Sequence, residues 1–259
     1  MTSFGAMHTG PTPISRQRPP LECLEGASLF LDFDGTLVDL AARPDAVTVD
    51  ERLRTVLRAL ETALDGRLAI VSGRSVAQIR ALLGDAAPSI SGSHGVELEW
   101  ADGRRRTPDR PAWLAPVVAR MEAFSRERPG VLVEVKPFGA ALHYRQAPEA
   151  EAASHGLVAA LAQDEGMHVQ KGKMMVELRM AGADKGDAVR AFMADAGMAG
   201  TVPLFLGDDL TDEPAFAAAA ELGGAGVLVG AERETAAAYR LEGVPETLAW
   251  LEAAAAALA

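Results

Sequence analysis

Cysteine is almost missing from this chain of 259 residues, because Cys23 is the single one. One cysteine excludes an internal disulfide and is typical of a reducing compartment. No apolar run is long enough to cross a membrane. The first twenty residues (MTSFGAMHTGPTPISRQRPP) also lack the apolar centre of a secretory signal. We therefore expect a cytoplasmic protein with a flexible N-terminal lead over residues 1–20.

Long basic blocks are missing as well, and the formal net charge is −11. An acidic chain of this kind does not favour nucleic acid or an anionic membrane as its main partner. Aromatic residues make up 5% of the chain, and its tryptophans show no spacing typical of a stacking platform, so we assign them to packing. The apolar fraction of 49% and the charged fraction of 24% are typical of a globular protein.

Apolar runs alternate with amphipathic segments near both ends of the chain. Residues 29–34, 67–73, 202–209 and 226–230 read as buried strands, and residues 48–64, 75–84, 184–197 and 211–224 have helical spacing. This alternation predicts a parallel sheet with crossover helices. We expect an α/β core domain formed by residues 21–107 and 180–259.

The middle of the chain follows another pattern. Helices are predicted over residues 115–127 and 153–166, and strands over residues 131–137, 140–146 and 173–179. Neighbouring strands joined by a short glycine-containing turn indicate an antiparallel sheet. Residues 108–179 are therefore expected to form an α+β domain inserted into the core domain.

Polar groups follow several of the predicted core strands or begin the helices after them. In open parallel sheets, ligands gather beyond the carboxyl ends of the strands. That rule brings together Asp32, Asp34, Gly35, Thr36, Ser72, Gly73, Arg74, Lys185, Asp208 and Asp209.

Carboxylates from different strands repel one another unless a cation lies between them. An all-oxygen set suits Mg²⁺, and no cluster of cysteine or histidine offers a zinc site. A phosphoryl-transfer site would be completed by the Gly35 amide, the Thr36 and Ser72 hydroxyls and Lys185. One carboxylate can act as nucleophile to form an aspartyl-phosphate, and the other as general acid and base.

Four motifs resemble those of the haloacid dehalogenase-like (HAD) phosphatases. They are DFDGTLVD at residues 32–39, VSGRS at 71–75, Asp-Lys-Gly at 184–186 and GDDLTDE at 207–213. The last motif, together with residues 91–99, 134–148 and 172–186, more narrowly resembles the trehalose-6-phosphate phosphatase family. The resemblance extends from residue 29 to the last helix.

The resemblance implies a HAD-like Rossmannoid core with an inserted α+β cap of the C2 type. It implies an Mg²⁺-dependent enzyme that hydrolyses trehalose 6-phosphate to trehalose and phosphate, downstream of a trehalose-6-phosphate synthase. Asp32 would be the nucleophile and Asp34 the general acid and base. Asp32, the main-chain carbonyl of Asp34, and Asp208 would hold the metal. Lys185 would steady the phosphoryl group and Asp32.

The remaining roles that the resemblance implies concern the substrate. Ser72 would bind the phosphoryl group, and Gly73 and Arg74 would complete that anion site. Asp212 would orient a water molecule or Lys185. In the cap, the expected sugar contacts are Lys136, Arg145, Lys173 and Glu177, and His143 is assigned to the scaffold.

Several alternatives stay open from the sequence. His94 and Glu97 have either a structural or a substrate-contacting role, and Asp209 and Glu213 either cap a helix or belong to the site. The nearest rival functions are another sugar-phosphate phosphatase and a hexose phosphomutase on the same core. A phospho-accepting receiver module lacks the second acid of DxDGT and a cap of this size. A catalytically dead binding protein does not explain the intact set of acids.

Overall fold

A central sheet organises the larger part of the computed structural model, which describes residues 16–40, 47–163 and 165–259. This sheet is eight-stranded, with the order β12-β11-β10-β1-β2-β3-β4-β5. Its strands are β1 (Ala27–Leu31), β2 (Leu68–Val71), β3 (Ser89–Gly92), β4 (Glu97–Glu99), β5 (Arg105–Arg106), β10 (Val202–Gly207), β11 (Ala225–Val229) and β12 (Tyr239–Leu241). All neighbours pair in parallel except β3 with β4 and β4 with β5. The predicted parallel sheet is confirmed, and its antiparallel edge was not predicted.

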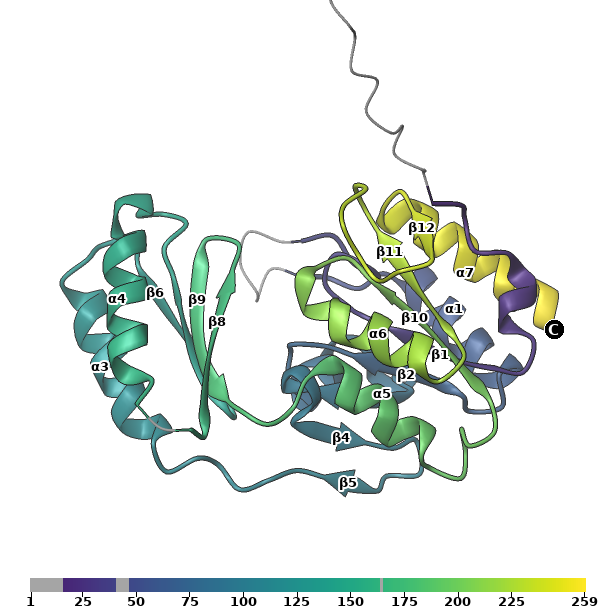
Figure 1. Cartoon of the computed structure of the whole chain (residues 1–259), viewed down its shortest axis with the longest axis horizontal. Helices are drawn as coiled ribbons and strands as arrows, with labels where there is room; N and C mark the ends of the chain where they lie inside the picture. The colour runs from purple at the N-terminus through teal and green to yellow at the C-terminus, as the bar shows by residue number, and fades with distance from the viewer. Residues whose placement is uncertain (1–15, 41–46, 164) are drawn as a thin grey trace, which may run out of the picture.

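Helices cover both faces of this sheet (Figure 1). They are α1 (Glu51–Ala63), α2 (Val76–Leu83), α5 (Lys185–Met193), α6 (Glu213–Glu221) and α7 (Val244–Leu258). Side chains alternate along a strand, so Leu29 and Leu31 join the hydrophobic cluster under α1, α2 and α7. Phe30 points the other way, into the cluster under α5 and α6. The strand is buried on both faces, which explains its continuous apolar sequence.

Local signals place the start of two core helices. Ser75 Oγ accepts a hydrogen bond from the Gln78 main-chain amide, and Gln78 Oε1 accepts one from the Ser75 main-chain amide, forming a capping box before α2. Asp184 and Asp187 form a second capping box before α5. These capping boxes fix the first residue of each helix. Both starts lie beside the carboxyl ends of the strands, where the candidate site lies.

The inserted domain is a four-stranded antiparallel sheet with the order β6-β7-β9-β8. Its elements are β6 (Leu132–Lys136), β7 (Gly139–His143), β8 (Met167–Gly172), β9 (Met175–Met180), α3 (Leu114–Arg126) and α4 (Glu151–Leu161). Figure 1 shows α3 and α4 on the outer face of this sheet, while its other face is turned toward the core domain. Leu142, Val176 and Leu178 pack toward the helices.

Strand β8 was not predicted from the sequence. The expected helix over residues 153–166 ends at Leu161, and the next regular element is β8. The sequence MHVQKG is mostly polar because this strand is half-exposed, so it lacks the apolar run on which the other predictions rested.

Short 3-10 turns join several elements, at Leu21–Leu24, Gly84–Ala86, Ser93–Gly95, Pro148–Ala150 and Leu210–Asp212. The predicted flexible lead falls largely outside the described residues, which begin at Arg16. Its final residues contact the core, because the Gln17 carbonyl accepts from the Arg240 amide at 3.0 Å. The Pro19 carbonyl accepts from Trp250 Nε1 at 2.9 Å. Among the described helices, we find none that combines the length and the apolar character needed to span a membrane.

Candidate active site

A buried lysine lies between two carboxylates at the carboxyl end of the central strands. Lys185 is the first residue of α5, and its Nζ donates to Asp32 Oδ1 at 2.7 Å and to Asp212 Oδ1 at 2.6 Å. Asp32 follows β1, and Asp212 ends the turn after β10. All three side chains are at most 5% exposed. A buried charge is tolerated only when it is paired, so these groups fix one another.

Asp208 brings a further carboxylate to this centre. Oxygens of Asp32, Asp208 and Asp212 lie within 4.8 Å of one another. Asp208 Oδ1 is buried and has no hydrogen-bond partner among the described residues. Burial and the charge of Asp212 raise the pKa of Asp208 to about 7. Burial also raises the pKa of Asp32, even though Lys185 opposes that shift.

This cluster fits a hard divalent cation. The acids outnumber the lysine that they share, and one of them, Asp208, has a buried oxygen without a partner among the described residues. Carboxylate oxygens are the ligands that Mg²⁺ prefers, and a bound cation would reverse both pKa shifts. Gly35 provides the space, because a Cβ there would lie 2.2 Å from Asp208 Oδ2. Its φ of +88° also disfavours any other residue.

Asp34 points away from the acid cluster. Its carboxylate accepts from Arg74 Nε and Nη2, both at 2.7 Å, in a two-point ion pair. Any metal contact from Asp34 would therefore come from its main chain, as the resemblance implies. Arg74 was predicted to bind an anion, and the structure directs its guanidinium to Asp34 as well as into the cleft.

The predicted phosphate-binding groups do not all reach the cleft. Ser72 Oγ accepts from the Arg74 amide at 3.1 Å, which leaves the hydroxyl hydrogen for a ligand. The Gly35 amide instead donates to the Val38 carbonyl at 2.7 Å, because it closes the turn after the strand. Thr36 is fully buried and does not line the cleft. The Gly35 amide is therefore not free for a phosphate, whereas the Thr36 hydroxyl is buried and has no hydrogen-bond partner among the described residues.

His94 lies over Gly73, where a Cβ would come within 2.5 Å of His94 Nε2. Its φ of 57° and ψ of 37° are left-handed, and Ser93 before it also has a positive φ. Such conformations cost free energy in residues other than glycine and collect at functional sites. Burial, with Lys136 and Lys185 adding to it, holds the pKa of His94 well below its usual value. His94 is thus a neutral cleft residue, while Glu97 accepts from Ser93 Oγ at 2.7 Å and supports this turn.

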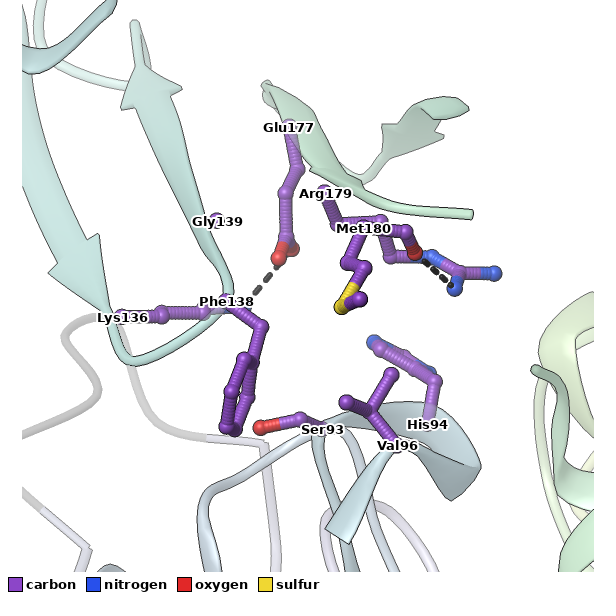
Figure 2. Close-up of a pocket in the computed structure, with 9 residues that line it drawn as sticks. All are labelled: Ser93, His94, Val96, Lys136, Phe138, Gly139, Glu177, Arg179 and Met180. Atoms are coloured by element: carbon purple, nitrogen blue, oxygen red, sulfur yellow. Dashed lines mark hydrogen bonds and ion pairs between the residues drawn. The ribbon is translucent and has the colours of Figure 1, made fainter. Parts of the chain in front are cut away.

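The cap contributes a buried ion pair to the opposite wall. Lys136 Nζ lies 2.6 Å from Glu177 Oε2, and the Glu177 side chain is 3% exposed. Figure 2 shows this pair above Phe138, with Ser93 and His94 of the core below. These residues of the two domains line one small pocket.

A larger cleft of about 910 Å³ runs between the domains. This volume is within the range of small-molecule sites. The predicted residues that line it are Asp32, Asp34, Ser72, Gly73, Arg74, Lys136, Arg145, Lys173, Glu177, Lys185, Asp208 and Asp209. Arg145 and Lys173 lie together at its edge, because Arg145 Nη2 donates to the Lys173 carbonyl at 3.4 Å.

The sequence did not point to every residue of the cap wall. Glu134 and Gln170 also line the cleft, as does His143, which was assigned to the scaffold. His143 Nε2 lies 2.8 Å from Glu134 Oε2. Gln170 Nε2 lies 3.4 Å from His94 Nε2. The available signal for Glu134 was its alternation with Lys136, which places both on one face of β6.

Comparisons with known proteins identify similar sequences. A family model described as Trehalose-phosphatase matches residues 30–245. The chain is 39% identical to the trehalose-6-phosphate phosphatase of Escherichia coli strain K12 over 231 residues, covering 88% of this chain and 86% of that one.

Solved structures share the fold. The C-terminal domain of the Candida albicans trehalose-6-phosphate phosphatase superposes with a TM-score of 0.79 at 22% identity, covering 95% of this chain and 99% of that one. A HAD-superfamily phosphatase from Bacteroides thetaiotaomicron gives a TM-score of 0.58 at 16% identity, covering 98% and 100% of the two chains. These likenesses confirm the predicted HAD-like α/β fold with a cap-like domain.

Proposed function

The chain belongs to the trehalose-phosphatase family, and from this premise we propose that it hydrolyses trehalose 6-phosphate to trehalose and phosphate. We propose further that the reaction passes through a phosphorylated Asp32 and requires Mg²⁺. The observation that carries the mechanism is the Lys185 ammonium between Asp32 and Asp212, beside the unpartnered oxygen of Asp208. The single lysine leaves the acids with excess negative charge, as a cation site requires.

Asp32 is suited to the nucleophilic role. It lies at the floor of the cleft, and Lys185 Nζ holds its Oδ1 at 2.7 Å, which leaves the other oxygen to attack phosphorus. The attack forms an oxygen–phosphorus bond and breaks the bond to the sugar oxygen. Ser72, through its free hydroxyl hydrogen, can donate to a phosphoryl oxygen.

Asp32 and Asp208, with the main-chain carbonyl of Asp34, would hold the magnesium ion. When bound, the ion supplies positive charge that neutralises the acids and the charge developing on the phosphoryl oxygens. The two-point ion pair with Arg74 holds the Asp34 carboxylate outside the acid cluster. Asp34 must leave this pair and carry a proton to protonate the leaving sugar oxygen, and it can afterwards accept a proton from the attacking water.

The cap residues Lys136, Arg145, Lys173 and Glu177 would bind the sugar. Their charges have mixed signs. A site that bound only phosphate would not be expected to contain the acid Glu177, because a carboxylate repels a phosphate anion. Sugar hydroxyls both donate and accept hydrogen bonds, so they can use both members of the Lys136–Glu177 pair. We also propose the division into core (21–107 and 180–259) and cap (108–179), a cytoplasmic location and an upstream synthase that supplies the substrate.

A panel of sugar phosphates tests the proposal. The purified protein with Mg²⁺ should release phosphate from trehalose 6-phosphate with a higher kcat/KM than from glucose 6-phosphate or sucrose 6-phosphate. Chelation should stop the reaction, and added Mg²⁺ should restore it. Full activity after dialysis against chelator would refute the metal assignment. Transfer of the phosphoryl group to a second sugar, with no phosphate release, would instead identify a mutase.

A further inference from the structure

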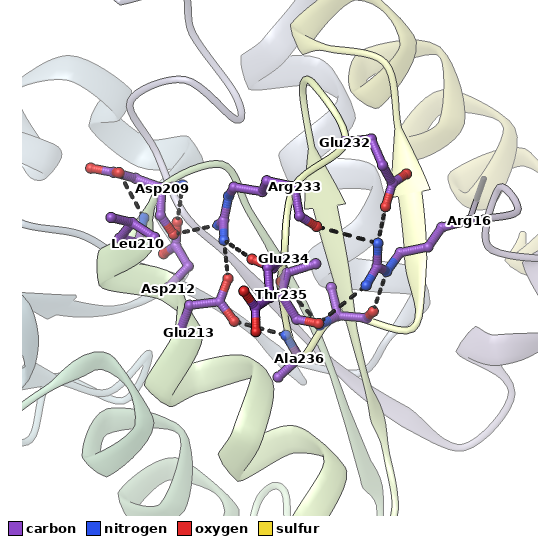
Figure 3. A network of polar contacts seen from close by, with 11 residues as sticks. Arg16, Asp209, Leu210, Asp212, Glu213, Glu232, Arg233, Glu234, Thr235 and Ala236 are labelled. Carbon is purple, nitrogen blue, oxygen red and sulfur yellow. Dashed lines mark hydrogen bonds and ion pairs between the residues drawn. The ribbon is translucent and has the colours of Figure 1, made fainter. Parts of the chain in front are cut away.

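The loop after β11, which we call the 230–238 loop, contacts the turn that carries Asp208 and Asp212. Figure 3 shows Arg233 reaching from this loop toward Asp209 and Glu213. Arg233 Nη2 donates to the Asp209 carbonyl at 2.9 Å, and Nη1 forms an ion pair with Glu213 Oε1. The guanidinium thus holds both the start and the end of this turn.

Glu213 completes the contact between the two segments. Its Oε2 accepts from the Ala236 amide at 2.8 Å, while its other oxygen binds Arg233. Burial alone would raise the pKa of Glu213, but the bonds from Ala236, Thr235 and Arg233 hold that pKa below its usual value. Glu213 is therefore an ionised bridge to the 230–238 loop, and this role goes beyond the helix capping considered from the sequence.

Arg16 holds the opposite side of the same loop. Its Nε donates to the Ala237 carbonyl at 2.7 Å, and Nη2 donates to the Thr235 carbonyl at 3.2 Å. It also forms an ion pair with Glu232. The 230–238 loop is thus bound by Arg16 on one side and by Glu213 on the other, so Arg233 extends from a loop that is held on both sides.

We infer that Arg233 is a positioning residue for the carboxylates of Asp208 and Asp212, an inference that rests on the proposed magnesium-dependent function. The Asp209 amide donates to Asp212 Oδ2 at 2.9 Å, and Asp212 Oδ1 accepts from Lys185. Arg233 binds the carbonyl of the same Asp209, one residue after Asp208. Removing that anchor frees the turn that directs Asp208 to the cation and Asp212 to Lys185.

The test compares Arg233→Met with Arg52→Met. Arg52 forms a comparable two-point pair with Glu252 between α1 and α7, away from the cleft. Groups that orient metal ligands typically contribute about tenfold or more to metal affinity. Arg233→Met should therefore raise the Mg²⁺ concentration for half-maximal activity about tenfold. It should also raise, by a similar factor, the Mg²⁺ concentration that half-saturates the thermal shift of the substrate-free protein. Arg52→Met should leave both values unchanged.

Glu213→Gln provides a second variant, because glutamine can still accept from the Ala236 amide while it loses the charge that holds Arg233. It should weaken Mg²⁺ binding in the same direction, and the double variant should lose less than the sum of the two. Unchanged Mg²⁺ half-saturation in Arg233→Met, with only a lower melting temperature, would overturn the positioning role and leave the proposed function intact. A wild-type protein that neither binds Mg²⁺ nor needs it would overturn both.

Discussion

The two walls of the cleft carry charge in different ways. On the core wall, Asp32, Asp208 and Asp212 share the single cation Lys185. On the cap wall, each acid has a partner, Glu177 with Lys136 and Glu134 with His143, and Arg145 and Lys173 add further basic groups. The pKa shifts follow this difference. Burial and neighbouring acids raise the pKa of Asp208 to about 7. Burial alone would also raise the pKa of Glu134, but the hydrogen bond with His143 and the charge of Lys136 together hold that pKa below its usual value.

This difference separates two tasks. Excess buried negative charge on the core wall is unfavourable until a cation binds there. Phosphoryl transfer needs such a bound cation to neutralise the charge that develops on the phosphoryl oxygens. On the cap wall, both acids already have partners without any ligand, and these pairs can exchange partners with a polyhydroxyl ligand. The core wall is therefore expected to govern the chemistry of every substrate, and the cap wall to govern which substrate is positioned for it.

Asp32→Asn gives the largest expected effect and tests the core half of this comparison. Asparagine keeps the shape of the side chain but is not a nucleophile, so no phosphorylated intermediate can form. Loss of a nucleophile costs more than about a thousandfold in kcat. Turnover of trehalose 6-phosphate and of p-nitrophenyl phosphate should fall together, measured by phosphate release. Residual turnover above trace level, with contaminating phosphatase excluded by repurification, would reject the covalent mechanism.

Lys185→Met should give the next largest loss. Methionine fills a similar volume, yet it leaves Asp32 and Asp212 without the ammonium that both accept from. Removing one preorganised charge from such a site costs on the order of 10²–10³ in kcat. Both substrates should again be affected alike. A loss confined to trehalose 6-phosphate would assign Lys185 to substrate choice and would break the division between the walls.

The core wall was largely predictable from the sequence. Asp32, Lys185 and Asp208 follow or begin elements whose apolar periodicity is strong, and the topology of a parallel sheet brings such ends together. What the sequence did not predict is where each polar group points. The Gly35 amide is used in a turn, and the Asp34 carboxylate turns to Arg74, because local hydrogen bonding decides these orientations.

The cap wall was predicted less completely. Strand β8 has few apolar residues, so Gln170 could not be assigned to a sheet face before the structure. The pairing of His143 with Glu134 depends on the register of β6 against β7, which no local pattern specifies. The link from Arg233 to Asp209 joins two loops 24 residues apart and has no sequence signal of its own.

Glu177→Ala tests the cap half of the comparison. One lost hydrogen bond to a charged group is worth about 1.5–3 kcal/mol, or roughly ten- to a hundredfold in kcat/KM. That loss is expected for trehalose 6-phosphate, because contacts to the distant sugar help position the ester for attack. Hydrolysis of p-nitrophenyl phosphate, which makes no sugar contact, should change little.

Two controls accompany this variant. Glu177→Ala leaves Lys136 buried without its partner, so Lys136→Met together with Glu177→Ala separates the loss of sugar contacts from an unpaired charge. Glu122→Ala, on the outer helix α3, should affect neither substrate. Equal losses of kcat/KM for both substrates would indicate that Glu177 has a structural role.

The smallest expected effect is a difference in the pH dependence of stability between the walls, measured in chelator. The folded pKa of Asp208 is about 7, above its ordinary value of 3.8, so the folded state binds the proton more tightly. Its contribution to stability is present at acid pH and is lost as the pH rises from about 4 through about 7. The folded pKa of Glu134 lies below its ordinary value of 4.5, so its contribution is present above that pH and is lost as the pH falls through the folded pKa.

Because the charged form of Asp208 is unfavourable in the folded protein, Asp208→Asn should stabilise the cation-free protein near pH 8, by on the order of 1–3 kcal/mol or a few degrees in Tm. Glu134→Gln should instead change stability mainly above about pH 4.5, where it removes a favourable charge. Stabilisation of the wild type by Mg²⁺ should be largest at pH 8 and smallest at pH 5. In Asp208→Asn, the stabilisation by Mg²⁺ should no longer depend on pH in this way. Equal stabilisation by Mg²⁺ at both pH values in the wild type would show that the core acids are already ionised without a cation, and the contrast between the walls would then fail.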